Sequence, residues 1–405
     1  MKIIAGYDPG RMYSKLHTII DGKEIKLKGP NAICIGYDRR VDDISKEMEF
    51  QNEDLLDITV IYATGEEERF FIGEFARKNH RSDLLTASNH VSKYSRLTAD
   101  KERGKLFAYL ALAGYQANKK ELRVRTGLGA PTEEFYDIEG KKELAEFEKG
   151  TAEVTVRLNH PKFNGFETRI IPTKMDFVAE GTASAFSAMY DIDVMEMELV
   201  ENVWMMKQLE RGPVYISNLG SSTEDSAILT KSGFDRRGFF GIDVGSSVAT
   251  IPLQEDLVKT YKFDKDKTTL DHLLYLSAES ESKIRYRDEL IDLTQMAKPR
   301  FKMMLERRNQ KVFDKLERNG IDPGDIVAQY QTGGTVEYLK LIKQEEYLKL
   351  FKHAAIKISE RPHEDEARGY YIASKLQHDL EVAQDAEKHG HEASGKSEEK
   401  AIEVS

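Results

Sequence analysis

Cysteine is nearly absent from this 405-residue sequence, in which Cys34 is the only one. A single cysteine excludes an internal disulfide framework and a zinc site built from cysteines. The sequence also lacks any apolar run close to the ~18 residues needed to cross a bilayer. Its first residues lack the apolar stretch and cleavage site of a signal peptide. We therefore expect a protein of the reducing cytoplasm that makes no membrane contact.

An excess of positive charge is missing as well. The chain has 60 lysine and arginine residues against 70 aspartate and glutamate residues, a net charge of −10. Direct binding to the DNA backbone would require a basic surface, so we expect no direct contact with nucleic acid. Hydrophobic residues make up 40% of the chain and charged residues 32%, which is typical of a globular protein. The length predicts two or more domains.

Two similar strand–turn–strand patterns stand far apart in the chain. In the first, strand Lys2–Tyr7 turns at Asp8-Pro9-Gly10 and returns as Lys15–Ile20. In the second, strand Val214–Ser217 turns at Asn218-Leu219-Gly220 and returns through Asp225–Thr230. Each pattern opens a region of alternating strands and helices. The repetition predicts two lobes of related topology that present their hairpins to a common cleft.

The remaining patterns suggest boundaries. Residues 36–69 are polar and poor in strands, which predicts a small inserted subdomain over about 31–95. Periodic apolar residues predict helices over 100–118, Glu180–Met189 and Pro299–Arg318. From about residue 385 the chain has almost nothing to bury, which predicts a mobile charged tail. We divide the chain into domain I (1–198), domain II (199–384) and the tail (385–405).

The first hairpin carries residues suited to a phosphate group, namely Asp8, Gly10, Ser14 and Lys15. A glycine allows backbone N–H groups to approach phosphate oxygens, and the Lys15 ammonium can reach the β- or γ-phosphate. Mg²⁺ keeps most of its waters and is usually held by one or two carboxylates, so Asp8 is expected to hold it through water. The alternative is an ordinary hairpin with a surface lysine.

The second hairpin has the same character. Small hydroxyl residues stand beside a glycine, a combination that favours an anion-binding nest; they are Gly220, Ser221, Ser222 and Thr223. The alternative is a serine-rich turn between two core strands. A competing segment, Ile242-Asp243-Val244-Gly245-Ser246-Ser247, has no clear returning strand and runs into a helix, so it ranks second.

Two further elements are candidates. Gly333 and Gly334 lie between a predicted strand and a helix, where a flat base or ribose could rest against the backbone. Glu180 begins an Ala/Ser-rich helix, where the helix dipole favours a carboxylate. A common strand–helix junction and a capping acid are the respective alternatives.

The two hairpins, the Glu180 helix and the Gly333-Gly334 junction, taken in their order along the chain, resemble motifs of the actin/Hsp70/sugar-kinase ATPase superfamily. The resemblance is greatest to its bacterial actin-like proteins of the plasmid-segregating ParM/StbA type. The resemblance spans roughly residues 1–380. It is carried by Asp8-x-Gly10-x-x-x-x-Lys15, Thr126-Gly127-Leu128-Gly129-Ala130-Pro131, Ala179-Glu180-Gly181-Thr182, Ser217-Asn218-Leu219-Gly220, Gln331-Thr332-Gly333-Gly334 and Glu366-Ala367-Arg368-Gly369.

The resemblance implies an α/β actin-like fold, with two RNase H-like lobes and a nucleotide cleft between them. It implies an ATPase that binds ATP or GTP with Mg²⁺, and it makes Glu180, Asn218 and Asp8 the catalytic residues. Glu180 would position the attacking water. It further implies self-assembly into cytoplasmic filaments that segregate plasmid DNA through a DNA-binding adaptor protein. A non-polymerising ATPase or kinase, and a structural filament with little turnover, are the alternatives.

One residue departs from the family pattern. The family normally has aspartate where this chain has Asn218, and an amide neither carries negative charge nor accepts a proton. We therefore predict slow hydrolysis, unless Asp225 or Asp243 compensates; an engineered substitution at this position is also conceivable. Serines replace glycines in the second hairpin, which changes its backbone cradle.

Overall fold

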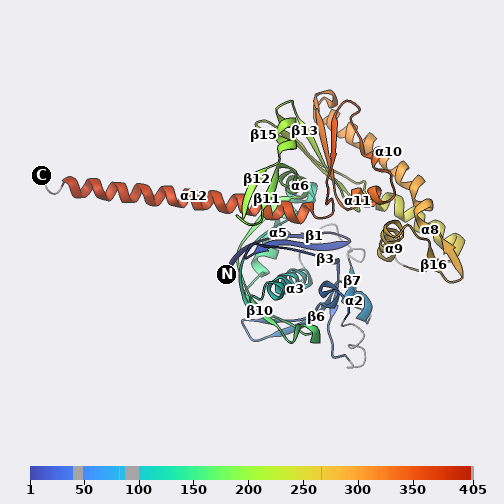
Figure 1. The fold of residues 1–405 in the computed structure, drawn as a ribbon, viewed down its shortest axis with the longest axis horizontal. Coiled ribbons are helices and arrows are strands. Elements are labelled where there is room, and N and C mark those ends of the chain that lie inside the picture. The colour runs from blue at the N-terminus through green and yellow to red at the C-terminus, as the bar shows by residue number, and fades with distance from the viewer. Residues whose placement is uncertain (40–48, 82, 87–99, 266, 403–405) are drawn as a thin grey trace.

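The computed structural model describes residues 1–39, 49–81, 83–86, 100–265 and 267–402. Its larger sheet has ten strands. In spatial order they are β3 (Lys23–Pro30), β2 (Tyr13–Ile20), β1 (Lys2–Pro9), β8 (Glu121–Ala130), β10 (Glu167–Ala179), β9 (Val154–Leu158), β5 (Asp57–Tyr62), β6 (Glu67–Ile72), β4 (Ala32–Ile35) and β7 (Leu85–Thr86). This sheet and the helices on it form the first lobe, the lower half of Figure 1.

The second lobe is built on a five-stranded sheet. Its order is β15 (Gly233–Ile242), β14 (Glu224–Thr230), β13 (Val214–Leu219), β18 (Ala328–Thr332) and β19 (Ala355–Ile358). In both sheets three consecutive antiparallel strands are followed by two parallel ones: β1 pairs with β8 and β8 with β10, as β13 pairs with β18 and β18 with β19. The hairpin repeated in the sequence thus belongs to a repeated sheet topology.

Helices cover the sheets. The first lobe has α2 (Glu74–Asn79), α3 (Asp100–Gln116), α4 (Thr132–Tyr136) and α5 (Ile138–Gly150); the second has α7 (Val203–Leu209), α8 (Ser247–Tyr261), α9 (Lys267–Glu279), α10 (Leu293–Arg318) and α11 (Gly334–Leu341). Short 3-10 helices cover Asn52–Leu55, Pro161–Phe163, Pro323–Asp325 and Glu345–Leu348. There are also two small hairpins: β11 (Tyr190–Asp193) pairs with β12 (Glu198–Glu201), and β16 (Ile284–Tyr286) pairs with β17 (Glu289–Ile291). Strand β13 is buried throughout, because a central strand is covered on both faces.

Helix α10 begins six residues before its predicted start. The prediction placed Pro299 at the first turn, where proline is favoured. In the structure the Asp292 side chain accepts a hydrogen bond from Gln295 N and caps the helix, and Pro299 lies inside it. The capping aspartate therefore decides where this helix begins, and the proline is tolerated one turn further on.

Two helices, α6 (Glu180–Met189) and α12 (Asp365–Ile402), pass between the lobes (Figure 1). They pack without intervening side chains. A Cβ added to Gly369 of α12 would lie 1.9 Å from the carbonyl oxygen of Ala183 of α6, and one added to Gly6 of β1 would lie 1.9 Å from that of Ala367. Only glycine allows backbones to approach this closely. Helix α12 therefore touches both the first sheet and α6.

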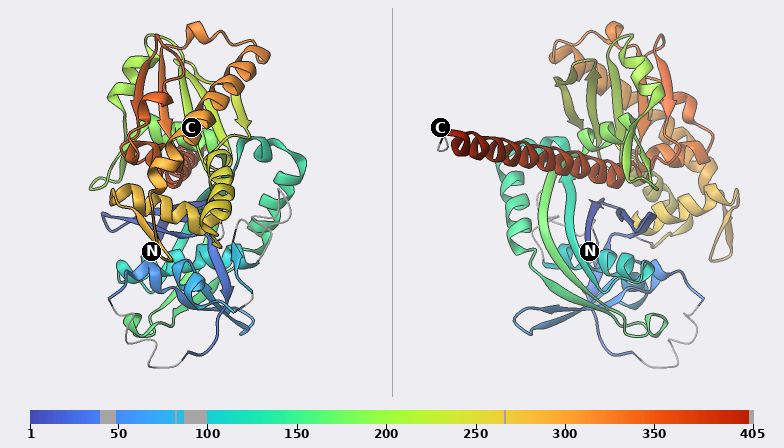
Figure 2. Two further views of the ribbon diagram at one scale, coloured as in Figure 1. Left: turned by 90° about the vertical axis from the view of Figure 1, so that its right-hand side faces the viewer. Right: turned by 60° about the vertical axis from the view of Figure 1, so that its left-hand side comes forward.

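The far end of α12 projects away from both lobes (Figure 1, and Figure 2, right). Near the first lobe, Glu381 of α12 pairs with Arg125 at 2.7 Å and with Lys174. The sequence predicted a mobile tail from residue 385, whereas the helical backbone continues to Ile402. Being helical and being mobile are separate properties, so the mobility stays a prediction.

The predicted subdomain over 31–95 is described only in part. Its strands β4 to β7 pair with one another, and β5 joins them to the first sheet through β9. The predicted division at 198/199 falls at the start of β12. Both boundaries stay predictions. In the described part of the chain, no helix has the length and apolarity that a bilayer span requires.

Candidate functional site

A cavity lies between the lobes, and the first hairpin forms one wall of it through Asp8, Gly10 and Lys15. Asp8 and Lys15 face each other in the β1–β2 register, and Lys15 Nζ lies 2.5 Å from Asp8 Oδ2. Burial opposes protonation of Lys15, but the nearby carboxylates, Asp8 first, outweigh it and raise its pKa. Lys15 is therefore a charged ammonium held at the cavity wall.

The turn between β1 and β2 is held from behind. A Cβ on Gly10 would lie 2.7 Å from the carbonyl oxygen of Tyr13, so a larger residue would crowd the turn. Asn31 Nδ2 donates a 2.7 Å hydrogen bond to the Gly10 carbonyl oxygen. Buried Lys105 in turn donates to Asn31 Oδ1. The loop is thus fixed in place before any ligand arrives.

Ser14 does not line the cavity, although the sequence placed it with the phosphate-binding residues. Successive side chains of a strand point to opposite faces. Tyr13 and Lys15 face the cavity, so Ser14 between them is fully buried on the other face. Its hydroxyl is therefore directed into the core of the first lobe.

The second hairpin forms the opposite wall with all of its predicted residues, namely Asn218, Gly220, Ser221, Ser222 and Thr223, and with Asp225. Gly220 N donates to the carbonyl oxygen of Thr223 at 2.9 Å and closes the turn. The Thr335 hydroxyl of α11 donates to the Gly220 carbonyl oxygen at 2.6 Å. The small hydroxyl residues of this turn thus border the same space as Lys15.

The competing segment supports this hairpin and forms no third one. Ser247 N donates to the carbonyl oxygen of Ser221 at 2.8 Å, and α8 begins at that residue. A Cβ on Gly245 would lie 2.5 Å from the carbonyl oxygen of Gly220. Asp243 is exposed and does not line the cavity, which leaves it without the compensating role considered for it.

A buried arginine anchors the base of the second hairpin. Arg308 of α10 has no solvent exposure and pairs with Glu224 at 2.6 Å. It also donates 2.9 Å hydrogen bonds to Ser217 Oγ of β13 and to Gln331 Oε1 of β18. A buried charge needs such complete pairing. One side chain thus ties β13, β14 and β18 together next to the cavity.

Gly333 and Gly334, the candidates for contact with a base or ribose, have two different roles. Gly334, the first residue of α11, lines the cavity. Gly333 lies behind it with φ +103°, and its Cβ would lie 2.4 Å from the carbonyl oxygen of Leu219. Gly333 therefore allows α11 to approach the second hairpin. Glu180, the first residue of α6, lines the cavity as well.

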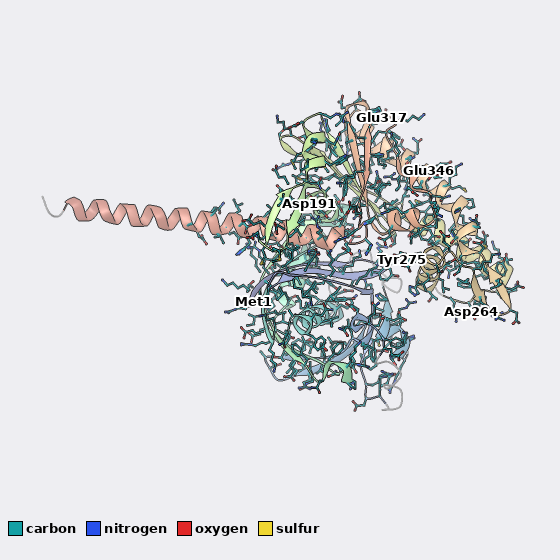
Figure 3. All side chains as sticks on the ribbon, in the orientation of Figure 1. Met1, Asp191, Asp264, Tyr275, Glu317 and Glu346 are labelled. Atoms are coloured by element: carbon teal, nitrogen blue, oxygen red, sulfur yellow. The ribbon has the colours of Figure 1, made fainter. Side chains whose placement is uncertain are left out.

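Four of the cavity residues that were not singled out from the sequence contact one another, namely Lys28, Tyr275, Glu337 and His363. Tyr275, labelled in Figure 3, donates to Glu337 Oε1 at 2.8 Å, and His363 contacts the other carboxylate oxygen. Burial opposes ionisation of Glu337, yet His363 and Tyr275 lower its pKa to about 2. Burial and the nearby Lys15 lower the pKa of Lys28 to about 8. These four side chains make one end of the cavity polar.

Glu366, in the first turn of α12, also lines the cavity; the sequence placed it in a family motif without giving it a chemical role. Asn218 Nδ2 donates to Glu366 Oε1 at 2.6 Å. Burial, then the nearby Asp8, raises the pKa of Glu366 to about 8. Asp225 also lines the cavity, but its Oδ1 accepts a 2.6 Å hydrogen bond from Thr132 N of the first lobe. The side chain paired with Asn218 is thus an acid from a third element.

Known proteins give a clear structural match. No family model and no curated protein matches this sequence. Among solved structures, a 15-stranded ParM filament from Clostridium botulinum is 17% identical, with a TM-score of 0.68 over 93% of this chain and 99% of that one. Bacillus thuringiensis ParM with AMPPNP is 15% identical, with a TM-score of 0.67 over 93% and 99%. An archaeal actin homolog is 14% identical, with a TM-score of 0.64 over 92% and 99%.

The chain has an actin-like fold of the ParM type. The fold class predicted from the ordered motifs is thereby confirmed. In this actin-like fold the two hairpins come from equivalent positions of the two repeated sheets, β1–β2 and β13–β14. This equivalence is why Asp8 and Lys15 lie across one cavity from the Gly220 turn.

The lining of the actin-like fold suits a magnesium–nucleotide complex. It offers cations at Lys15 and Lys28, small turn residues around Gly220 and carboxylates at Asp8 and Glu366. Among the described residues, no three His, Cys, Asp or Glu side chains form a cluster that could hold a metal by themselves. Mg²⁺ carried on phosphates needs only one or two carboxylates and keeps several waters. The donors present therefore fit Mg²⁺ that enters with a nucleotide.

Proposed function

We propose that this chain is an ATPase that binds Mg-ATP in the interlobe cavity and polymerises into cytoplasmic filaments. We further propose that the filaments segregate plasmid DNA through a DNA-binding adaptor protein. The observation that carries the nucleotide site is the convergence of Asp8, Lys15 and the Gly220 turn on one cavity. A cation and two small-residue turns on facing walls suit a chain of phosphates.

Each residue would have a separate task. Lys15 and the backbone around Gly10 and Gly220 would stabilise the charge of the transferring phosphoryl group, where most catalysis of this reaction originates. Glu180 would orient the attacking water, a role typically worth about 10²–10⁴ in rate. Mg²⁺, held through water by Asp8, would neutralise phosphate charge. Gly334 and the polar end of the cavity would hold the nucleoside, in which adenine and guanine remain equal alternatives.

Assembly and cargo are supported more indirectly. The solved structures of similar fold include a ParM filament and ParM with AMPPNP, ATP and ADP. The net charge of −10 disfavours direct contact with DNA, which supports an adaptor between filament and plasmid. The single cysteine, Cys34, is buried, and a chain with one cysteine cannot form an internal disulfide, which is consistent with a reducing cytoplasm.

The test combines sedimentation with phosphate release. Mg-ATP, unlike EDTA, should move the protein into the pellet, and phosphate should follow. Protein that hydrolyses ATP but stays in the supernatant would indicate a non-polymerising ATPase or kinase. Pelleting without phosphate release would indicate a structural filament. An absence of nucleotide binding would overturn the proposal.

A matched pair of lysine variants locates the site. Lys15→Met should weaken ATP binding about 10–100-fold, because it removes charge-assisted hydrogen bonds worth roughly 1.5–3 kcal/mol. Lys231→Met removes the same charge from an exposed turn of the second lobe and should bind ATP like the unmodified chain. Equal affinities for both variants, measured by fluorescent-nucleotide titration, would exclude Lys15 from the site.

A further inference from the structure

The carboxylates of the cavity differ in their availability. Asp8 pairs with Lys15, Asp271 pairs with Lys267 at 2.5 Å, and Glu337 is held by Tyr275 and His363. Asp225 accepts from Thr132 N and from the Thr223 hydroxyl at 3.1 Å. For Glu366, only Oε1 has a hydrogen-bond partner within the described ranges, and that partner is the Asn218 amide. Its second carboxylate oxygen therefore remains available to a ligand in the cavity.

The position of Glu366 is fixed by its neighbours in α12. Asp365 accepts a 2.6 Å hydrogen bond from the Thr332 hydroxyl and a 3.0 Å bond from the Ser187 hydroxyl. One turn later, Arg368 donates to the carbonyl oxygens of Ser187 and Tyr190, both at 2.7 Å. The first turn of α12 is therefore anchored to β18 and α6. This anchoring fixes the backbone of Glu366 beside the cavity, and the contact with Asn218 holds its side chain there.

Asn218, the partner of Glu366, is an amide that can donate a hydrogen bond to an acid. A second acid at position 218 could not do so while both groups are ionised. Asn218 is buried, and its Nδ2 group, a donor, faces the carboxylate. Its Oδ1 lies on the side of Gly333, whose Cβ would come within 2.6 Å of it. An aspartate at position 218 would place two carboxyl groups within hydrogen-bond distance, and the pair would have to share a proton. The amide at 218 and the acid at 366 are therefore complementary.

We infer that Glu366, the α12 carboxylate that contacts the second hairpin at Asn218, binds the water shell of a nucleotide-bound Mg²⁺ together with Asp8, and that Asn218 orients the Glu366 side chain. The inference rests on the proposed nucleotide site and identifies a residue that the hairpin motifs alone do not contain. A divalent cation in the cavity favours the ionised form of nearby acids, which offsets the effect of burial on Glu366. Glu366 of α12 thereby supplies the negative charge that Asn218 lacks.

The test measures how much Mg²⁺ strengthens the binding of a non-hydrolysable ATP analogue, at protein concentrations that do not pellet. Glu366→Gln should reduce the Mg²⁺-dependent gain in affinity about tenfold or more, the range for removing an outer partner of a metal. Affinity in EDTA should change less than about twofold, since the neutral isostere keeps its contact with Asn218. Glu360→Gln, an exposed glutamate before α12, is the matched control and should retain the full gain.

The exchanged pair distinguishes charge from packing. Asn218→Asp combined with Glu366→Gln returns one acid and one amide to the same contact, so it should restore the Mg²⁺-dependent gain to within about threefold of the unmodified chain. If Glu366→Gln also loses binding in EDTA, the double variant still tests the role of the charge, because it restores both the contact and one acid. A full gain in Glu366→Gln, or none in the double variant, would overturn the inference.

The failure of the proposed function would look different. An unmodified chain that binds no nucleotide in either Mg²⁺ or EDTA would overturn both statements. An unmodified chain with a clear Mg²⁺-dependent gain that Glu366→Gln leaves intact would overturn only the role of Glu366.

Discussion

At the scale of single residues, Arg308 shows how charge can hold the framework of a cavity without lining it. Its guanidinium has no access to solvent and bonds to Glu224, Ser217 and Gln331. Glu224 directly precedes Asp225, which does line the cavity. Pairing at Arg308 therefore connects both strands of the second hairpin to α10 next to the cavity.

Replacing Arg308 should be costly. Arg308→Met removes the charged partner of the buried Glu224 carboxylate and leaves it only the hydroxyls of Tyr215 and Ser217. This should lower the free energy of unfolding by about 3–5 kcal/mol. Arg307→Met, on the exposed face of the same helix, should change it by less than about 0.5 kcal/mol. Urea unfolding measures both, and similar values for the two variants would contradict the role given to Arg308.

Glu337 predicts a dependence of stability on pH. Its folded-state pKa is lowered to about 2, whereas the ordinary value is 4.5. An acid whose pKa falls on folding stabilises the protein fully above its unfolded pKa and loses that contribution as the pH falls toward the folded one. The difference in melting temperature between the unmodified chain and Glu337→Gln should therefore shrink from pH 5 to pH 3. A difference that stays constant would show that His363 and Tyr275 do not hold this carboxylate.

At the scale of elements, two adjacent glycines at the start of α11 have opposite requirements. Gly333 has φ +103° and ψ 159°, a region accessible almost only to glycine, and Gly334 already belongs to the helix. No atom lies within 4 Å of a Cβ built on Gly334. The junction between β18 and α11 therefore needs one glycine and tolerates a side chain at the next position.

This difference is open to measurement. Gly333→Ala should destabilise the fold by at least about 1–3 kcal/mol from backbone strain alone, with the contact to Leu219 adding to it. Gly334→Ala should be neutral or stabilise by up to about 1 kcal/mol, because alanine favours the helix. Chemical denaturation of the two variants checks the order, and a reversed order would refute the assignment of the junction.

The sequence reveals those elements whose geometry is local. Turn residues such as Asp8 and Gly220 predict hairpins because turn chemistry acts over a few residues. Ser14 was misplaced because spacing in the sequence does not say which face of a strand a side chain occupies. Glu366 received no chemical role because its contact with Asn218 spans 148 residues and depends on how α12 crosses the sheets. No local pattern encodes such a contact.

At the scale of the whole molecule, the cavity is a joint product of both lobes and α12. The first hairpin, the second hairpin and Glu366 belong to different units of the chain, yet they line one space. A ligand there would contact all of them at once. Binding should therefore stabilise the entire molecule, since any opening between the lobes would separate groups that the ligand joins.

Thermal unfolding tests this coupling. At a ligand concentration about 100 times Kd, binding to the folded state alone adds roughly 2.7 kcal/mol of stability. Mg-ATP should therefore raise the midpoint of a single cooperative transition for the unmodified chain, and Lys15→Met should show a smaller rise at the same concentration. Two transitions, of which only one responds to nucleotide, would mean that the lobes bind and unfold independently.

Helix α12 connects the interior of the molecule with its surroundings. It is 38 residues long, and at about 1.5 Å per residue it extends roughly 57 Å from Glu366 at the cavity to a point well outside both lobes. A tilt of about 5° at its anchored first turn would displace the outer end by about 5 Å. Small rearrangements around the cavity would thus be magnified along the helix into displacements that a neighbouring molecule could sense.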